Sequence, residues 1–290
     1  MTSAFLPATA FLRRALVRRV RAVFNDRAKG EKPVVRSSNA LFPRDSVIWR
    51  VHGDVTTMMV GGVSALLLQM LHPAALAGIW DHSTFRDDML GRLRRTARFI
   101  AVTTYADRAD ALAAIERVKD VHDRVTGILA DGTPYSANDP HLLAWVHVTE
   151  ALCFLDAWIR YGEPGMSRKD QDSYFAQFAE VAIMLGANPV PRTRAEAEAL
   201  AGRMHPELHA DPRTREVARM VLHQKAPGPA AMPVQRMVME AAVDLLPRWA
   251  RVMHGLPIRN LRLPAIRLST RLVAGTIRWA FAGERSPLEK

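Results

Sequence analysis

The sequence predicts an all-α protein: a single multi-helical domain built around a buried apolar central helix. Three observations point to this class. Apolar residues recur at helical spacing over most of the 290 residues, whereas no run alternates apolar and polar residues as a half-buried strand would. No formally charged side chain occurs between Asp54 and Asp81, as is typical of a helix buried on all sides. The hydrophobic content of 49% is ordinary for a folded globular chain.

The first expected helix covers residues 5–24 and is amphipathic and basic. One side is apolar, and the other carries several arginines, among them Arg13, Arg14, Arg18 and Arg21. A helix lying in a membrane interface and a helix packed on the body of the protein both remain open. Residues 25–46 are polar and are expected to form a linker or a wrapping loop. We therefore divide the chain into a basic arm with its linker (1–45) and a main domain (46–290).

The uncharged stretch that follows is long enough to cross a bilayer, but several features interrupt it. Gly61-Gly62 and His72-Pro73 break the apolar run, and Pro73 is expected to kink or end a continuous helix. We therefore place this segment in the core of the domain. His72 is expected to bond the carbonyl groups that the kink frees, with a ligand role as the alternative. His82 is expected at a helix N-cap, in a structural role.

The region from Gly91 to Thr126 carries the most distinctive pattern. Arg92, Arg95 and Thr96 share one face of an expected helix, for which a solvated face is the alternative interpretation. Asp107 or Asp110 then begins another amphipathic helix. Its apolar stripe contains His122, which should therefore be substantially buried. Spacing alone favours a hydrogen-bonded core histidine over a ligand.

Further helices are expected over the rest of the chain. Asp139-Pro140 supplies an N-cap and a first-turn proline. In the helix that follows, His147 and Glu150 are three residues apart, but the chain contains no Glu-x-x-His sequence, so a di-iron centre is not expected. Asp131 to Pro134 form a turn, and no hairpin is expected. The later helices are expected at 167–187, 192–204, 211–225, 234–254 and 262–282, the last with a basic face formed by Arg267, Arg271 and Arg278.

The net charge of +11 lies at the two ends of the chain. Residues 1–50 carry +8 and residues 251–290 carry +6, whereas the middle carries −3. This distribution argues against a nucleic-acid-binding domain, in which the folded face is basic. It suits contact with anionic lipid or an acidic partner, with a merely solvated surface as the alternative. The single Cys153 excludes a disulfide or a cysteine zinc cluster within the chain. No signal-peptide pattern is evident.

Three runs of residues resemble a known family. LLLQMLHPAALAGIWDHSTFRDDMLGRLRRTARF, VHDRVTG and NDPHLLAWVHVTEAL are similar to the MpaB-like oxygenases. These share a catalytic domain with the latex-clearing rubber oxygenases and the ER-bound oxygenase of mycophenolic acid biosynthesis. The likeness covers roughly residues 45–280. It implies a globin-reminiscent all-α fold holding one haem b, which activates dioxygen to cleave isoprenoid double bonds in the rubber oxygenases.

The resemblance also implies roles for particular residues. His122 matches the axial histidine of the haem iron, and Arg92 and Thr96 match residues that line the site and that we expect to act in catalysis. Arg95 stands where rubber oxygenases can use a lysine as second axial ligand. Because a guanidinium stays protonated and offers no lone pair, Arg95 is expected to pair with a haem propionate or another anion, leaving the sixth position open. His72 and His147 resemble recurrent family positions, without an assigned role. The rubber oxygenases' acidic base has no identifiable counterpart.

These inferences predict a haem b-dependent oxygenase that acts with dioxygen on a lipophilic molecule, for which an isoprenoid is one candidate. They place it in the cytoplasm, with peripheral membrane contact through its basic termini and no nucleic-acid partner. One alternative is a non-haem metal oxygenase of the same fold. The other is a non-enzymatic peripheral membrane or lipid-binding helical protein, in which His122 is only a core residue.

Overall fold

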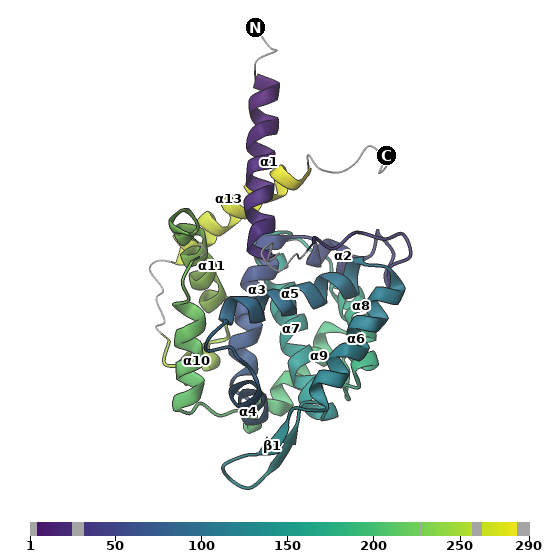
Figure 1. Ribbon diagram of the computed structural model, residues 1–290, viewed down its shortest axis with the longest axis vertical. Helices are drawn as coiled ribbons and strands as arrows, with labels where there is room; N and C mark the ends of the chain where they lie inside the picture. The colour runs from purple at the N-terminus through teal and green to yellow at the C-terminus, as the bar shows by residue number, and fades with distance from the viewer. Residues whose placement is uncertain (1–4, 25–31, 227, 257–262, 283–290) are drawn as a thin grey trace.

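A computed structural model describes residues 5–24, 32–226, 228–256 and 263–282. The described chain is helical apart from one short hairpin, which confirms the all-α class (Figure 1). The helices are α1 (Phe5–Phe24), α2 (Val47–His52), α3 (Val55–Gln69), α4 (Pro73–His82), α5 (Met89–Tyr105), α6 (Arg108–His122), α7 (Pro140–Tyr161), α8 (Arg168–Leu185), α9 (Arg194–Met204), α10 (Pro212–Leu222), α11 (Met232–Leu245), α12 (Arg248–Met253) and α13 (Leu263–Ala282), with 3₁₀ turns at His205–Glu207 and Pro229–Ala231.

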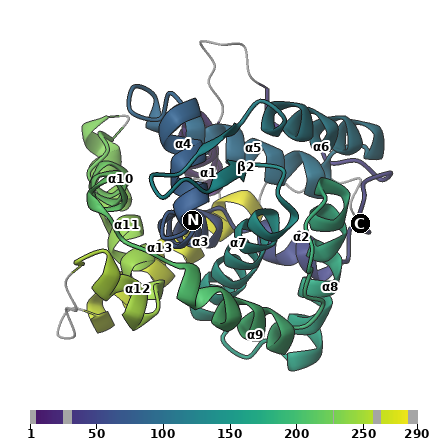
Figure 2. The same cartoon turned by 90° about the horizontal axis from the view of Figure 1, so that it is seen from below.

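Helices α3 and α7 form the centre of the fold, and the other helices surround them (Figure 2). The two backbones approach closely at Gly61, where a Cβ atom would lie 2.8 Å from the carbonyl oxygen of Cys153. Ser64 on α3 also donates a hydrogen bond to the carbonyl of Ala242 on α11, over 2.8 Å. The uncharged stretch therefore forms the core of the domain, as the sequence predicted.

The break between α3 and α4 is sharp. The two helices meet at an angle of 103°, and Pro73 is the first residue of α4, so the predicted interruption is confirmed. The partner predicted for the His72 side chain, a carbonyl group freed by the kink, is wrong. The His72 side chain caps α4 by accepting a hydrogen bond from the amide of Ala74 at 3.2 Å, rather than bonding freed carbonyls. Its Nε2 also lies 3.5 Å from a carboxylate oxygen of Glu207.

By length and composition, α7 could cross a membrane, and so could α3 and α4 if they are counted as one span. However, 72% of the apolar window of α7 is buried inside the fold. A core helix passes the same test as a membrane span, because both are apolar on every side.

A short hairpin follows α6, although none was predicted. Strand β1 (Thr126–Ile128) pairs antiparallel with β2 (Pro134–Ser136), and the predicted turn between them contains Gly132 at a φ of +89°. Strands of three residues are too short for an alternating pattern to show. The hairpin packs on α4, where the Tyr135 hydroxyl donates to Asp81 over 2.9 Å. His82 is the last residue of α4, and its Nε2 lies 3.0 Å from the carbonyl oxygen of Thr126. The prediction that His82 lies at a helix N-cap is therefore wrong.

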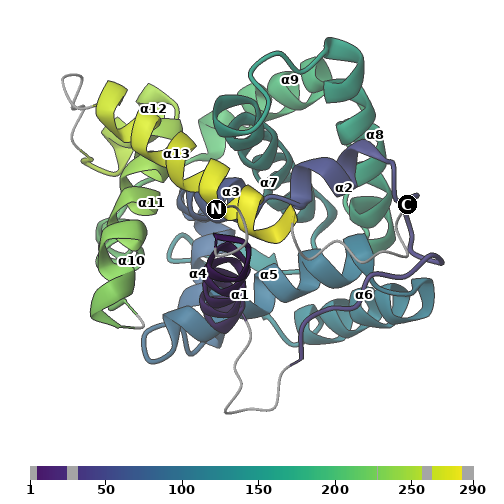
Figure 3. The same ribbon diagram turned by 90° about the horizontal axis from the view of Figure 1, so that it is seen from above.

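Helices α1 and α13 lie on the side of the molecule opposite the hairpin (Figures 1 and 3). The α1 helix has the bounds expected from the sequence and packs on α13 and α5. Val17 in its packed part is 1% exposed, whereas Phe11 farther out is 60% exposed. The predicted basic face of α13 is only partly present. Arg267 and Arg278 turn inward onto buried carboxylates, those of Asp244 and Asp54.

Two further segments differ in detail from expectation. The stretch expected as one helix over 234–254 is divided into α11 and α12, with Pro247 at the N-cap of α12. The described part of the predicted linker, from residue 32, wraps the body. The amide of Ser37 donates to the carbonyl of Tyr105, and the amide of Arg108 donates to that of Asn39. The predicted boundary between residues 45 and 46 stays a prediction.

Candidate functional site

Three helices bring one polar side chain each to a common place in the apolar interior. Arg92 stands in the second turn of α5, His122 ends α6, and Glu150 lies in the middle of α7. The charge of Arg92 lowers the pKa values of both His122 and Glu150, so its guanidinium lies close to both groups. The structure thus brings together Arg92 and His122, which the sequence analysis singled out, and adds a carboxylate that it did not.

The local sequence sets the start of each of these helices. The side chain of Asp88 accepts a hydrogen bond from the amide of Gly91 at the N-terminus of α5. Asp107 caps α6 in the same way, and Asp139 followed by Pro140 begins α7. The predicted N-caps at Asp107 and Asp139 are confirmed. Each cap determines where the first turn begins, and thereby which face of the helix carries the functional side chain.

Burial changes the acidity of Glu150 and Arg92. Loss of hydration raises the pKa of Glu150 to about 7, although Gln69 and Arg92 offset part of the effect. Burial, followed by repulsion from Arg95, lowers the pKa of Arg92 to about 10, so this guanidinium stays charged at pH 7. Protein surrounds both groups, yet both keep partial solvent accessibility. Both groups are therefore largely desolvated without being sealed from solvent.

His122 is half-buried, and the pKa of its imidazole lies below the ordinary value, which favours the neutral ring. Burial is the main cause of its lowered pKa, Arg92 lowers it further, and Asn138 and Asp123 act in the opposite direction. The Nδ1 atom of His122 and the Oδ1 atom of Asn138 are both buried without a hydrogen bond of standard geometry. Asn138 nevertheless lies close enough to raise the pKa of the imidazole. A neutral imidazole is the form that can bind a metal ion.

The other two predicted site residues, Arg95 and Thr96, are exposed on α5. A side-chain nitrogen of Arg95 lies 3.8 Å from Asp88, and this side chain is 58% exposed. The Thr96 hydroxyl donates back to the carbonyl of Arg92, one turn earlier in the same helix, over 3.4 Å. Arg95 therefore lies near Arg92, on the solvent-exposed side of the cluster. The contacts of Arg95 and Thr96 with a cofactor stay predictions.

Other buried histidines lie outside this cluster of charges. Burial lowers the pKa of His147 to about 4, and its Nε2 is buried without a partner, beside the ring of Phe178. His52 contacts the hydroxyl groups of Thr104 and Tyr174 over 2.9 and 3.1 Å. Within the described ranges, no group of three or more His, Cys, Asp and Glu side chains could hold a metal ion. A haem iron needs only one protein ligand, so this finding does not bear on His122.

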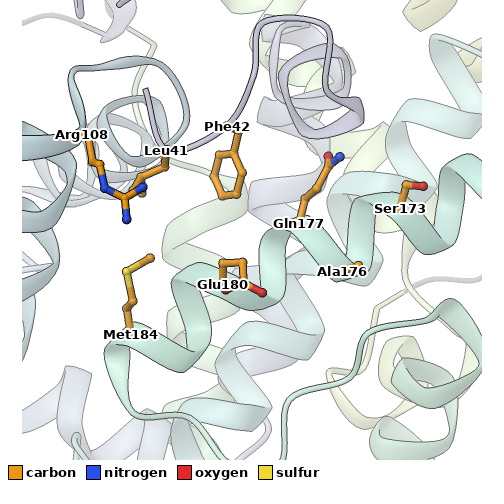
Figure 4. Close-up of a pocket in the computed structure, with 8 residues that line it drawn as sticks. All are labelled: Leu41, Phe42, Arg108, Ser173, Ala176, Gln177, Glu180 and Met184. Carbon is orange, nitrogen blue, oxygen red and sulfur yellow. The ribbon is translucent and has the colours of Figure 1, made fainter. Parts of the chain in front are cut away.

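A separate cavity of about 480 Å³ opens at the other end of α6 (Figure 4). Arg108 on its wall is the first residue of α6, whereas His122 is the last, which places the two about 21 Å apart at 1.5 Å per residue. Glu180, across the cavity, forms an ion pair with Arg192 at 3.0 Å. The lining residues are Leu41, Phe42, Arg108, Ser173, Ala176, Gln177, Glu180 and Met184. This cavity is not part of the Arg92–His122 cluster.

Sequence reasoning missed Glu150, Gln69 and Asn138 as members of the site. The available signal for Glu150 was a carboxylate within an otherwise apolar helix, which was considered only as a partner of His147. Gln69 is close enough to Glu150 to lower its pKa, and donates to the carbonyl of Val146 at 3.3 Å. Neither Gln69 nor Asn138 has a local pattern that distinguishes it from a structural residue.

The fold and the cluster define a helical domain in which one imidazole and one arginine, both half-buried, lie near each other. Comparison with protein families identifies its class. The model of the family described as "ER-bound oxygenase mpaB/B'/Rubber oxygenase, catalytic domain" matches residues 49–279, and the chain belongs to this family. This confirms the resemblance found in the sequence. The comparisons with curated proteins and with solved structures found no match.

Family membership makes this chain an oxygenase catalytic domain, and hence an enzyme. An oxygenase acts on dioxygen together with a small-molecule substrate.

Proposed function

We propose that the protein is a haem b-dependent oxygenase with His122 as the axial ligand of the iron. The observation that carries this proposal is the state of His122. Its pKa is lowered by burial, the half-buried Arg92 lies near it, and no described residue forms a hydrogen bond with its Nε2. A histidine that only fills a core is normally bonded through at least one ring nitrogen. His52 in this protein is bonded through both ring nitrogens, whereas the Nε2 of His147 is also buried without a partner, which leaves His147 as the other candidate ligand.

The chemical types of the residues around His122 support this proposal. Arg92 and Arg95 place two guanidinium groups on one face of α5, where they would bind the two propionate carboxylates. Thr96 lies on the same face and would line the site. Haem, when bound, supplies the chemistry of dioxygen activation, while the chain controls access and polarity. Glu150, with a pKa of about 7, is suited to hold or release a proton beside Arg92.

We propose a lipophilic substrate, of isoprenoid type in the first instance. Leu93 and Phe99 on α5, the helix that carries Arg92, are partly buried against the hydrophobic core. Helices α3 and α7 are apolar on most of their surface. A site enclosed by such helices favours an apolar ligand held by few polar contacts.

The absorption spectrum and iron content of the protein, purified with haem supplied during expression, test the cofactor. We expect one haem per chain with a Soret band, which is lost or shifted in His122→Ala. His141→Ala is the matched control, because His141 is exposed and contacts only Glu207 through its ring. A wild-type protein that binds no haem, or a His122→Ala variant with an unchanged spectrum, would refute the assignment.

The same absorption spectrum and iron content distinguish a haem oxygenase from a non-haem metal oxygenase. One equivalent of metal per chain without a Soret band would favour a non-haem oxygenase of the same fold, with ligands still to be found. The spectra of His72→Ala and His147→Ala would show whether either histidine contributes a ligand, since neither has a role assigned by its contacts.

We further propose that the enzyme is cytoplasmic and contacts an anionic membrane surface through α1 and α13. Neither of these helices contains an Asp or a Glu. Leu268, Leu272 and Trp279 form an exposed stripe along α13, at 59%, 63% and 42% exposure. Arg14 and Arg18 are exposed on α1. Apolar side chains beside arginines suit the interface of an anionic bilayer, such as the cytoplasmic leaflet.

Co-sedimentation with vesicles tests this contact. We expect binding to vesicles containing phosphatidylglycerol, weaker binding to pure phosphatidylcholine, and loss of binding in Arg14→Glu/Arg18→Glu. Arg168→Glu/Arg203→Glu is the matched control, because it changes the net charge equally at exposed positions on α8 and α9. Equal loss in both double variants would show a general charge effect. Membrane binding together with an absence of any cofactor would favour the non-enzymatic alternative.

A further inference from the structure

The side-chain amide of Asn138 is held in one orientation. Its Nδ2 donates hydrogen bonds to the carbonyl of Lys119 at 3.2 Å and to a carboxylate oxygen of Asp123 at 2.7 Å. Both partners are acceptors, so the nitrogen of the amide must face them and the oxygen must point the other way. The backbone amide of Asn138 also donates to the hydroxyl of Ser136 at 3.2 Å, which holds the residue in place before α7.

The side-chain amide of Asn138 lies close to the imidazole of His122. Lys119 and Asp123 lie three residues before and one residue after His122, so the amide spans the last turn of α6 beside the imidazole. Asn138 Oδ1 and His122 Nδ1 are both buried and both without a hydrogen bond of standard geometry. Two such atoms next to each other are each other's natural partner, because a buried polar atom left unpaired is costly.

This arrangement determines which ring nitrogen carries the proton. An amide oxygen can only accept a hydrogen bond, so the Nδ1 atom of a neutral His122 must be the protonated one. The lone pair then lies on Nε2. Since Nε2 is not among the buried atoms that lack a partner, it is the ring nitrogen that remains open to a ligand.

We propose that Asn138 is a positioning residue that fixes the Nδ1–H tautomer of His122 and directs the lone pair of Nε2 to the site. The tautomer is a property of the chain alone, and only the use of Nε2 as an iron ligand rests on the proposed function. Partners that orient a ligating histidine in this way typically change metal affinity 10–100-fold when they are removed. We therefore expect Asn138→Leu to weaken haem binding by about that factor.

The ¹⁵N spectrum of histidine-labelled protein without haem tests the tautomer directly, at a pH above the pKa of His122. We expect a protonated Nδ1 and an unprotonated Nε2 for the wild type, with the signals assigned by comparison with His122→Gln. Asn138→Leu should lose this preference. Asp123→Asn/Asn138→Asp should keep it, because the exchange leaves a donor at 123 and an acceptor at 138. Asn39→Leu, which removes an asparagine bonded to Asp107, is the control for loss of a surface amide.

Two outcomes overturn the inference: a wild-type protein with the proton on Nε2, or an Asn138→Leu variant that is folded by circular dichroism and keeps the wild-type tautomer. If Asn138→Leu does not fold, the wild-type spectrum and the exchanged double variant still decide the question. A haem titration of the same samples separates the two proposals. The expected tautomer without haem binding would leave the inference standing and refute the proposed function. If Asn138→Leu instead binds haem as tightly as the wild type and keeps the wild-type tautomer, the inference is refuted and the proposed function stands.

Discussion

Replacing Glu150 by Gln should change how the stability of the protein depends on pH. Burial raises the pKa of this carboxyl from 4.5 to about 7. Between these values the folded chain keeps a proton that the unfolded chain releases, so the stabilisation is complete below pH 4.5 and is lost as the pH rises through 7. A difference of about 2.5 pKa units corresponds to about 3 kcal/mol, an upper value because part of the side chain meets solvent.

Urea unfolding of the haem-free protein at several pH values between 4.5 and 8 measures this effect. Glutamine has the shape of the neutral acid and does not titrate, so the variant and the wild type should differ little at pH 4.5. By pH 8 the variant should have gained up to about 3 kcal/mol relative to the wild type. Other buried groups titrate in both proteins and cancel in the difference.

A difference between the two proteins that stays constant across this pH range would refute the reasoning. It would mean that Glu150 is hydrated, or fully compensated by Arg92, in the folded state. Glu116→Gln is the matched control, because Glu116 is 64% exposed and forms only a surface ion pair with Lys119. Its stability difference should show no comparable change with pH.

Three further predictions concern the frame that holds the site. Gly61→Ala should destabilise the protein by about 1–3 kcal/mol in urea, because the new Cβ would lie 2.8 Å from a backbone oxygen of α7; Gly165→Ala, which meets open space, should not. Asp244→Ala should cost about 2–4 kcal/mol in thermal or urea unfolding, since its carboxylate is 2% exposed and bonded to two partly exposed arginines. Tyr135→Phe removes the bond to Asp81, so it should cost about 1 kcal/mol and speed amide exchange in the hairpin.

The helices were largely predictable because their signals are local. Asp107 and Asp139 are capping residues whose side chains bond amides only two or three residues ahead, so their role can be read from the neighbouring sequence. Pro73 acts on its own helix in the same way. The hairpin escaped prediction, because its strands are short and its stability comes from Tyr135 packing on α4, far away in the sequence.

The site was predictable only in part. Spacing alone favoured His122 as a core residue. The family resemblance instead assigned His122 as an iron ligand and Arg92 as a residue that lines the site. That the two residues lie close to each other follows from the packing of α5 against α6. Glu150 joins them from α7, and nothing in its own helix predicts which residue of α5 it will meet.

The sequence by itself determined the helical class, most helix starts, the break at Pro73 and the apolar character of the central helices. Each of these depends on periodicity or on bonds within one turn. The tertiary structure alone decided which polar groups meet. It turned Arg267 and Arg278 inward onto buried carboxylates, and it set the amide of Asn138 beside His122. Such partners are chosen by packing between distant segments, which places the donor of one helix against the acceptor of another without leaving a local pattern in either.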